Sequence, residues 1–430
     1  MKPTFTTFLR LPLVGLLFST GPVIVRAAEP EPSVTLDLLV QEIAKNNPEL
    51  HFYEQEISAA KAGQRVATAW NDPELSVQGG RKRVRDTAGV LAGEGNAWSV
   101  SVTQTFEWPG RLALRKAIAN QQIELAELGL ARFKAALIGR ARNLSYGVFA
   151  AEELSSATKE VAERYQTLRE LYLGRDPAGL TPLLDTRVIE AKELAIKRRA
   201  TEADLAAQAA LVELNQLRGA PMESVLRVTG VQIIFHPAPP LSELLAAARE
   251  KNFDFRMKKV ELEQQGLEVS LARNERYPAV AVSPFFSHET GGDQQTILGL
   301  GMSVPLPLGS RSRAGVDLAE SRRRQAETTL IVAQRQLERE VIIASQAFAA
   351  KLAAASDWKP DAVEKFREAA ALADRHYRLG AVPLSTYVEL QNSYLDAVEA
   401  LLDTKREALE AGQQIELLTG LNFEAAENKP

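Results

Sequence analysis

The sequence predicts a membrane α+β protein in which each chain supplies four transmembrane β-strands to a barrel shared between copies, and long helices continue that barrel as a tube. Three observations lead to this prediction: an export signal without a later spanning helix, ten-residue segments of alternating polarity, and helical segments too long for a compact core. The chain also repeats its own pattern, which indicates two tandem structural repeats.

Residues 1–28 have the layout of a secretory signal peptide. Lys2 and Arg10 precede the uncharged run LPLVGLLFSTGPVIV at 11–25, and small residues follow up to Ala28. A membrane anchor is the alternative, but this run is shorter than the roughly 20 residues of a spanning helix. The chain contains no cysteine, so a lipid cannot be attached through one, and any membrane contact must come from the fold.

The composition is that of a folded protein, with 45% hydrophobic and 25% charged residues among 430. A net charge of -4, from 51 basic and 55 acidic residues, gives no basic face of the kind that binds nucleic acid. We therefore expect no nucleic-acid partner.

The chain repeats itself after about 200 residues. The segments LDLLVQEIAKNNPEL at 36–50 and LSELLAAAREKNFDF at 241–255 share leucine and asparagine positions, among them Asn47 and Asn252, and later landmarks follow at a similar offset. The expected divisions are a first repeat at 29–220, a linker at 221–240, a second repeat at 241–420 and a tail at 421–430.

Each repeat has the order helix, two strands, long helix, helix. The helical pattern covers 36–69, 111–173 and 183–218 in the first repeat and 241–276, 311–379 and 384–418 in the second. A helix of roughly 60 residues extends about 90 Å at 1.5 Å per residue. Such helices must pack side by side along an apolar seam like that of a coiled coil.

The strands are expected near 73–81, 97–106, 279–288 and 295–304. In the second of them Trp98, Val100 and Val102 alternate with serine and threonine, which gives one apolar and one polar face. A half-buried soluble sheet would show the same alternation. In a membrane, however, four strands cannot leave open edges, so several copies must share one barrel, and three copies would supply twelve strands.

Proline is expected to end helical hydrogen bonding where the chain changes from helix to strand. Trp108, next to one of these prolines, suits the aromatic girdle of a membrane barrel. The arginines Arg81, Arg83 and Arg85 are expected in a connection outside the cell, either solvated or in contact with lipopolysaccharide phosphates. The helix-strand transition prolines are Pro73, Pro109, Pro278 and Pro307.

These motifs resemble the outer-membrane efflux family typified by TolC, and more closely its CzcC-like cation-efflux branch. The resemblance lies in WNDPELSV, QTFEWPGRLALR, YPAVAVSPFF, GLGMSVPLPLGSRSRAGVDLAE and YRLGAVPLSTYVELQNSYLDAVEAL, and it covers nearly the whole mature chain. It implies a homotrimer with a twelve-stranded barrel in outer membrane lipid and a periplasmic α-helical barrel, docked on a periplasmic adaptor protein and an inner-membrane pump. Many relatives carry a lipidated N-terminal cysteine, which this chain lacks.

The resemblance also implies that acidic residues at the start of the helix after each break line the periplasmic aperture. Asp185 and Glu389 stand at such positions, and rings of carboxylates would favour cation passage. The alternative is that they are solvated acids complementing the helix dipole.

No motif for catalysis stands out. His51, His236, His288 and His376 are scattered without ligand spacing, and no phosphate loop or nucleophile elbow is present. We expect no enzyme activity, no cofactor and no metal site.

The predicted function is a passive exit duct in the outer membrane of a Gram-negative bacterium, in a tripartite efflux system for heavy-metal cations of RND type. A channel for type I secretion or multidrug efflux is the alternative within the same architecture. A periplasmic coiled-coil scaffold protein with a soluble sheet is the alternative from a different class.

Overall fold

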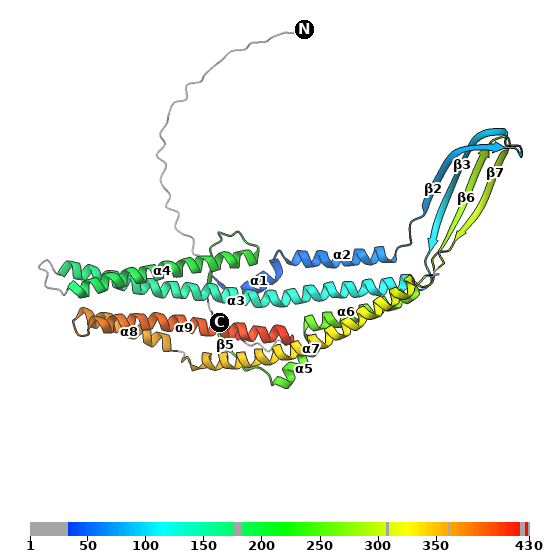
Figure 1. Cartoon of the computed structure of the whole chain (residues 1–430). Coiled ribbons are helices and arrows are strands. Elements are labelled where there is room, and N and C mark those ends of the chain that lie inside the picture. The colour runs from blue at the N-terminus through cyan, green and yellow to red at the C-terminus, as the bar shows by residue number, and fades with distance from the viewer. Residues whose placement is uncertain are drawn as a thin grey trace, which may run out of the picture.

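The computed structural model describes residues 33–175, 183–229, 231, 233–306, 309–359, 361–421 and 426–428. The predicted signal peptide, residues 1–28, lies outside the described residues. A long helical part carries a curved sheet that projects from one of its ends, which we call the strand end (Figure 1). The opposite end, where residues 379–383 connect two helices, is called the far end.

The helices form where apolar residues recur at a spacing of three and four, as Leu36, Leu39, Val40 and Ile43 do in the first helix. They are α1 (Leu36–Asn46), α2 (Leu50–Thr68), α3 (Arg111–Arg175), α4 (Leu183–Arg218), α5 (Leu241–Lys251), α6 (Phe253–Asn274), α7 (Arg311–Asp357), α8 (Ala362–Arg378) and α9 (Leu384–Thr419). The strands are β1 (Ser33–Thr35), β2 (Glu74–Arg85), β3 (Leu91–Phe106), β4 (Arg227–Thr229), β5 (Ile233–Phe235), β6 (Val280–Thr290), β7 (Gln294–Ser303) and β8 (Ala426–Asn428).

Two helices that the sequence predicts as continuous, 36–69 and 241–276, are each broken by an asparagine. Asn47 separates α1 from α2, and its side-chain amide donates to the carbonyl of Leu217 at 2.8 Å. Asn252 separates α5 from α6, and its side-chain amide donates to the carbonyl of Leu418 at 2.9 Å. In each break the asparagine thus donates to a carbonyl near the end of a long helix, α4 in the first case and α9 in the second. The tandem duplication itself stays a prediction.

The expected helix at 311–379 is also two helices, α7 and α8. The sequence between them, Trp358 to Asp361, includes a proline, which has no amide hydrogen to donate and so interrupts a helical ladder. The 65 residues of α3, in contrast, form one helix, as the sequence predicts.

The projecting sheet has the antiparallel order β2-β3-β6-β7. Its first hairpin is longer than expected, because β2 continues to Arg85 and β3 already begins at Leu91. The prediction that Arg81, Arg83 and Arg85 lie in a connection is therefore wrong: all three are strand residues. The turn itself is held by Asp86, whose carboxylate accepts from the amides of Ala88 and Val90, both at 2.9 Å.

The register places most of the apolar residues of the four strands on one face. Val77, Val100, Phe286 and Leu298 form one row across the sheet, and Leu75, Val102, Pro284 and Leu300 belong to the next. The opposite face carries serine, threonine and glycine, and there Thr103 and Ser283 share a hydrogen bond of 2.8 Å.

The predicted linker at 221–240 contains strands that join it to both ends of the described chain. β4 pairs in parallel with β1, and β5 pairs antiparallel with β8. The apolar core nearby includes Leu39 and Ile43 of α1, Leu214 of α4 and Val228 of β4. This segment therefore fastens the two halves of the chain at the middle of the helical part.

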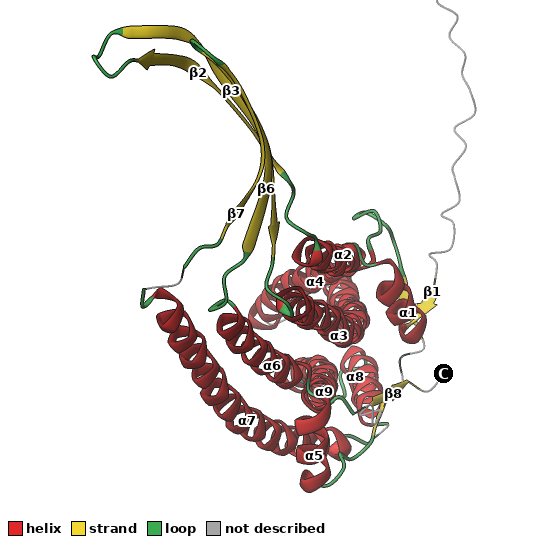
Figure 2. Ribbon diagram, turned by 90° about the vertical axis from the view of Figure 1, so that its right-hand side faces the viewer, coloured by secondary structure: helices red, strands yellow, loops and turns green. Residues whose placement is uncertain are grey.

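The helices at the strand end lie in the order α2-α3-α6-α7, with neighbours in contact. Each of them continues into the strand at the same position of the sheet, which has the order β2-β3-β6-β7 (Figure 2). Towards the far end the order is α4-α3-α9-α8. The chain is thus a curved layer with two unpaired margins. In this layer each of the four strands connects to one of the four helices, in the same order.

The outer part of the sheet depends on glycine at two positions of β3. A Cβ on Gly95 would lie 1.7 Å from the carbonyl oxygen of Thr290, and one on Gly93 would lie 2.7 Å from the amide nitrogen of Gly292. The turn between β6 and β7 can therefore rest against β3 only where β3 has no side chain.

We expect Gly95→Ala to separate the two hairpins and to destabilise the assembled protein by about 1–3 kcal/mol, as overpacking does. The measurement is the temperature at which the folded species disappears on a gel. Gly80→Ala, at a position with open space around it, is the matched control and should leave that temperature unchanged. Equal temperatures for both variants would show that this close approach is absent.

Candidate channel wall and its two ends

The sheet presents a wall with one apolar and one polar face. On the apolar face Leu298, Leu300 and Met302 expose 82%, 72% and 74% of their surface, although they belong to an ordered strand. On the other face Phe285 covers Gly299, where a Cβ would meet the ring at 2.5 Å. Large exposed apolar side chains in a continuous band mark a surface that contacts lipid or another protein.

Aromatic rings gather where the apolar face meets the helices. Trp108 stacks on Tyr277 with ring centroids 5.0 Å apart, and Trp70 meets Phe106 edge-on at 5.9 Å. Trp108, the predicted interface residue, lies just after β3 and is 39% exposed. Aromatic side chains with one polar edge suit the boundary between lipid and water, but the interface role of Trp108 stays a prediction.

The predicted transition prolines lie between helix and strand where the structure describes them. Pro109 stands between β3 and α3, Pro278 between α6 and β6, and Pro73 directly before β2. Pro307 is outside the described residues. The proposed role of these prolines in the transition remains a prediction.

A buried arginine fastens this junction. Arg111, only 7% exposed, donates to the side-chain oxygen of Asn274 at 3.1 Å and to the carbonyl of Tyr277 at 2.7 Å. It also pairs with Glu107 at 2.8 Å, and Arg115 pairs with the same carboxylate at 3.0 Å. Burial acts to raise the pKa of Glu107, but the two arginines outweigh burial and lower that pKa. The first turn of α3 is thereby fixed to the last turn of α6.

The predicted aperture acids lie toward the far end. Glu389 is exposed in the second turn of α9 and lines a groove of about 900 Å³ together with Val188, Tyr377 and Asp396. Asp185 belongs to the first turn of α4, but its side chain lies outside the described part of the chain. The roles of both carboxylates at the aperture therefore stay predictions.

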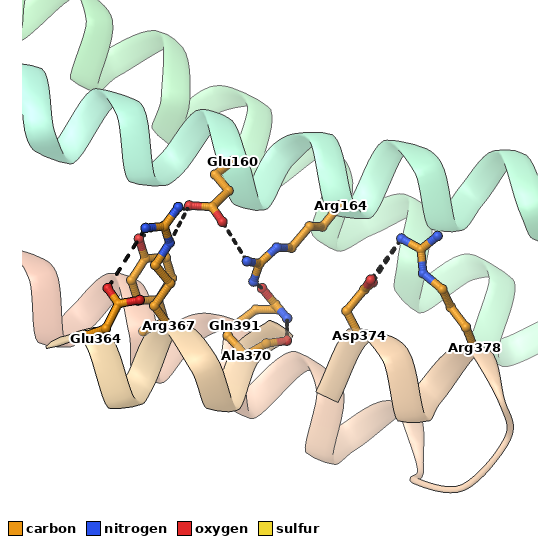
Figure 3. A network of polar contacts seen from close by, with 9 residues as sticks. Glu160, Arg164, Glu364, Arg367, Ala370, Asp374, Arg378 and Gln391 are labelled. Carbon is orange, nitrogen blue, oxygen red and sulfur yellow. Dashed lines mark hydrogen bonds and ion pairs between the residues drawn. The ribbon is translucent and has the colours of Figure 1, made fainter. Parts of the chain in front are cut away.

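Between this end and the middle, polar side chains join α3 to α8 and α9 (Figure 3). Arg164 of α3 donates to Gln391 of α9 at 3.0 Å and to Glu160 at 2.6 Å. Gln391, which is completely buried, donates in turn to the carbonyl of Ala370 in α8 at 2.8 Å. Arg367 of α8 pairs with Glu160 at 3.4 Å. We call Glu160, Arg164, Arg367 and Gln391 the inter-helix network.

Three tyrosine rings pack beside the inter-helix network. Tyr387 of α9 meets Tyr165 of α3 edge-on and stacks on Tyr377 of α8, with 5.3 Å between centroids in both pairs. Burial raises the pKa of Tyr165 to about 12 and raises that of Tyr387 further. These hydroxyls therefore stay neutral at physiological pH, and the contact between the hairpin α8–α9 and α3 combines an apolar core with a polar margin.

Sites for chemistry are not found in the part of the chain that the structure covers. There, no group of three or more histidines and acids could hold a metal ion. His288 bonds Thr296 at 3.0 Å and His51 pairs with Glu54 at 3.2 Å, each as a local surface contact. None of the described helices has a stretch long and apolar enough to cross a bilayer.

Comparison with known proteins gives a family match in the second half of the chain. Residues 244–421 match the family model described as outer membrane efflux protein. This part of the chain, somewhat less than half of it, is similar to that family. That description gives the location of the protein, the outer membrane, and the class of its activity, efflux. The sequence-based identification is thus confirmed for the family, whereas its cation-efflux branch stays a prediction.

The outer membrane efflux fold extends over almost the whole chain. CusC, described in terms of transmembrane channel formation, has a TM-score of 0.69 at 16% identity, covering 90% of this chain and 92% of its own. A membrane protein from Pseudomonas aeruginosa has a TM-score of 0.71 at 20% identity, covering 90% and 91%. The CmeC outer membrane channel of Campylobacter jejuni has a TM-score of 0.68 at 15% identity, covering 90% and 85%. No protein of curated function matches the sequence itself.

The inter-helix network could not be predicted from the sequence. Arg164 and Gln391 are separated by 227 positions, and each is a common polar residue on a helix. The only available signal is that Gln391 falls at a position where the helical period predicts an apolar core residue. Arg111, by contrast, is marked by its place in the motif WPGR, directly after the strand.

Proposed function

We propose that three copies of this chain form a closed duct through the outer membrane, with a twelve-stranded barrel in the lipid and a helical tube below it in the periplasm. The observation that carries the proposal is the four-stranded sheet with an apolar face, a polar face and two free margins. Unpaired strand edges are not tolerated in hydrocarbon, so the margins β2 and β7 must pair with other copies.

The dimensions of the apolar face support a membrane position. From Trp98 to Phe106 the strand β3 advances eight residues, about 27 Å at roughly 3.4 Å per residue. At a tilt near 40° this covers about 21 Å, close to the apolar band about 25 Å tall of outer membrane barrels. Aromatic rings stand at both limits of this band, Trp98 with Phe286 at one and Trp108 with Tyr277 at the other.

The cargo is proposed to be metal cations, moved by an inner-membrane pump through a periplasmic adaptor protein. The support is the similarity to the cation-efflux motifs and the exposed acid Glu389 at the far end. Multidrug efflux and type I protein secretion are the alternatives, because the same duct would serve them with other partners. The duct itself supplies no energy and performs no reaction.

The test of the duct is its assembly state in the cell envelope. The outer membrane fraction should contain a trimer that survives detergent at low temperature and separates into monomers on boiling. A periplasmic scaffold protein would instead be released by osmotic shock as a soluble species. Recovery in the soluble fraction would contradict the proposal.

The aperture acids are tested by conductance of the trimer in planar bilayers. Glu389→Ala and Asp185→Ala together remove six carboxylates from the trimer, and we expect the preference for cations over anions to fall by about twofold or more. Asp37→Ala, which removes an exposed acid from α1, is the control and should leave the preference unchanged. An unchanged preference in the double variant would show that other groups set the selectivity.

A further inference from the structure

The apolar face of the sheet ends at one row of residues that crosses all four strands. In this row the ring of Trp98 lies 5.3 Å from that of Phe286 and 6.1 Å from that of His288. The neighbouring row on the side of the helices contains only aliphatic and aromatic residues. The neighbouring row on the outer side contains only polar residues. The row at the limit consists of Gly79, Trp98, His288 and Thr296.

Beyond this limit the same face becomes basic. Residues two apart in a strand share a face, so Arg81, Arg83 and Arg85 continue the line of Val77 and Gly79 along β2. Lys82 points to the polar face, where it pairs with Glu289 at 3.1 Å. Three guanidinium groups therefore stand on the apolar side of the sheet, just outside its apolar band.

Their charge is only partly balanced. Among the residues that the structure describes, Arg81 has no ion pair, and it stands in register with the uncharged Asn96. Arg83 pairs through its Nε with Glu94 at 2.8 Å, and its side chain is 62% exposed. Arg85 donates to the carbonyl of Gly89 at 3.2 Å. The neighbouring strands offer Thr290 and Gln294 at this level, so nothing there neutralises Arg81.

The height of these arginines matches that of lipid headgroups. Each step of two residues advances about 7 Å along a strand, so Arg81 lies about 7 Å and Arg83 about 14 Å beyond the Trp98 row. Tryptophan marks the boundary between acyl chains and headgroups. Pairing of β2 with a neighbouring copy would use backbone groups and would leave this face open.

We infer that Arg81 and Arg83, with Trp98 beneath them, bind the phosphate groups of a phosphorylated glycolipid in the outer leaflet. The inference rests on the proposed function, in which this face of the sheet contacts the outer membrane lipid. A guanidinium can hold a phosphate through two parallel hydrogen bonds, which suits a fixed headgroup better than a freely hydrated ion. The glycolipid would thereby seal the outer rim of the barrel.

The experiment titrates the detergent-solubilised trimer with bisphosphorylated lipid A and measures binding by native mass spectrometry. For Arg81→Gln with Arg83→Gln we expect affinity to fall by about tenfold or more, since a charge-assisted contact is worth at least a factor of ten. Lys82→Gln, which removes one charge from the same strand on the opposite face, is the matched control and should bind as the unchanged protein does. Lipid A without phosphates should show the same loss in the unchanged protein.

Three results would overturn the inference. The first is equal affinity of the double variant and the unchanged protein, and the second is equal binding of phosphorylated and dephosphorylated lipid A. The third is displacement of the lipid by millimolar inorganic phosphate, which would indicate a site for free anions. If the outer membrane trimer is stable and gives any of these results, only the lipid inference is contradicted. If no trimer forms, the proposed duct and the lipid inference are both contradicted.

Discussion

Leu300→Arg is expected to prevent assembly of the protein in the outer membrane. Leu300 is 72% exposed at the centre of the apolar face, in register with Pro284. An arginine on the lipid face of a barrel costs about 2–4 kcal/mol at the bilayer midplane, and a trimer would carry three. The measurement is the amount of heat-dissociable trimer in the outer membrane fraction, which should fall below a tenth of its normal level.

The matched control is Ser303→Arg in the same strand. Ser303 lies on the polar face, three positions along β7, so its side chain would point into a water-filled lumen. This variant should assemble normally, with an altered conductance as its only effect. If both variants assembled equally well, the apolar face would not contact lipid, and the sheet would be a soluble one.

The second large effect is expected from Gln391→Ala in the inter-helix network. The change removes the acceptor of Arg164 and the donor to the Ala370 carbonyl, both in a fully buried position. Each buried polar group left without a partner costs about 1–3 kcal/mol. We expect the hairpin α8–α9 to separate from α3 more readily, so that the conductance of the isolated trimer rises several-fold.

The readout is single-channel conductance in planar bilayers, accompanied by the unfolding temperature of the trimer. Arg198→Ala serves as the control, because it removes an exposed ion pair with Glu202 on the surface of α4. That variant should change neither quantity. A lower unfolding temperature for Gln391→Ala with unchanged conductance would mean that the network supports the fold without restraining the aperture.

The strands and the long helix could be predicted because the spacing of their apolar residues can be recognised within a single segment of the sequence. The alternation of Trp98, Val100 and Val102 is sufficient to assign their face, and β7 shows the same pattern from Leu298 onward. The outer extension of the first hairpin is different, since glycines and charged residues between 78 and 96 resemble a loop in composition. Only pairing with the partner strand makes that segment a strand.

Features that depend on distant partners were not predictable. Asn47 interrupts its helix because its side-chain amide donates to the carbonyl of Leu217, 170 positions away. The same holds for Gln391, which is buried because Arg164 approaches from the other half of the chain. A single sequence contains each of these residues but not the contact that gives it its role.

The two halves of the chain differ in how continuous their long helices are. The hydrogen-bonded ladder of α3 runs without interruption from the strands to the far end, whereas on the other side the path passes from α7 to α8 through the break after Asp357. In the proposed duct, a bending force applied at the periplasmic end would therefore be transmitted to the barrel by α3 and absorbed at the break between α7 and α8. We expect such a duct to rearrange its lower rim while its upper rim keeps its shape.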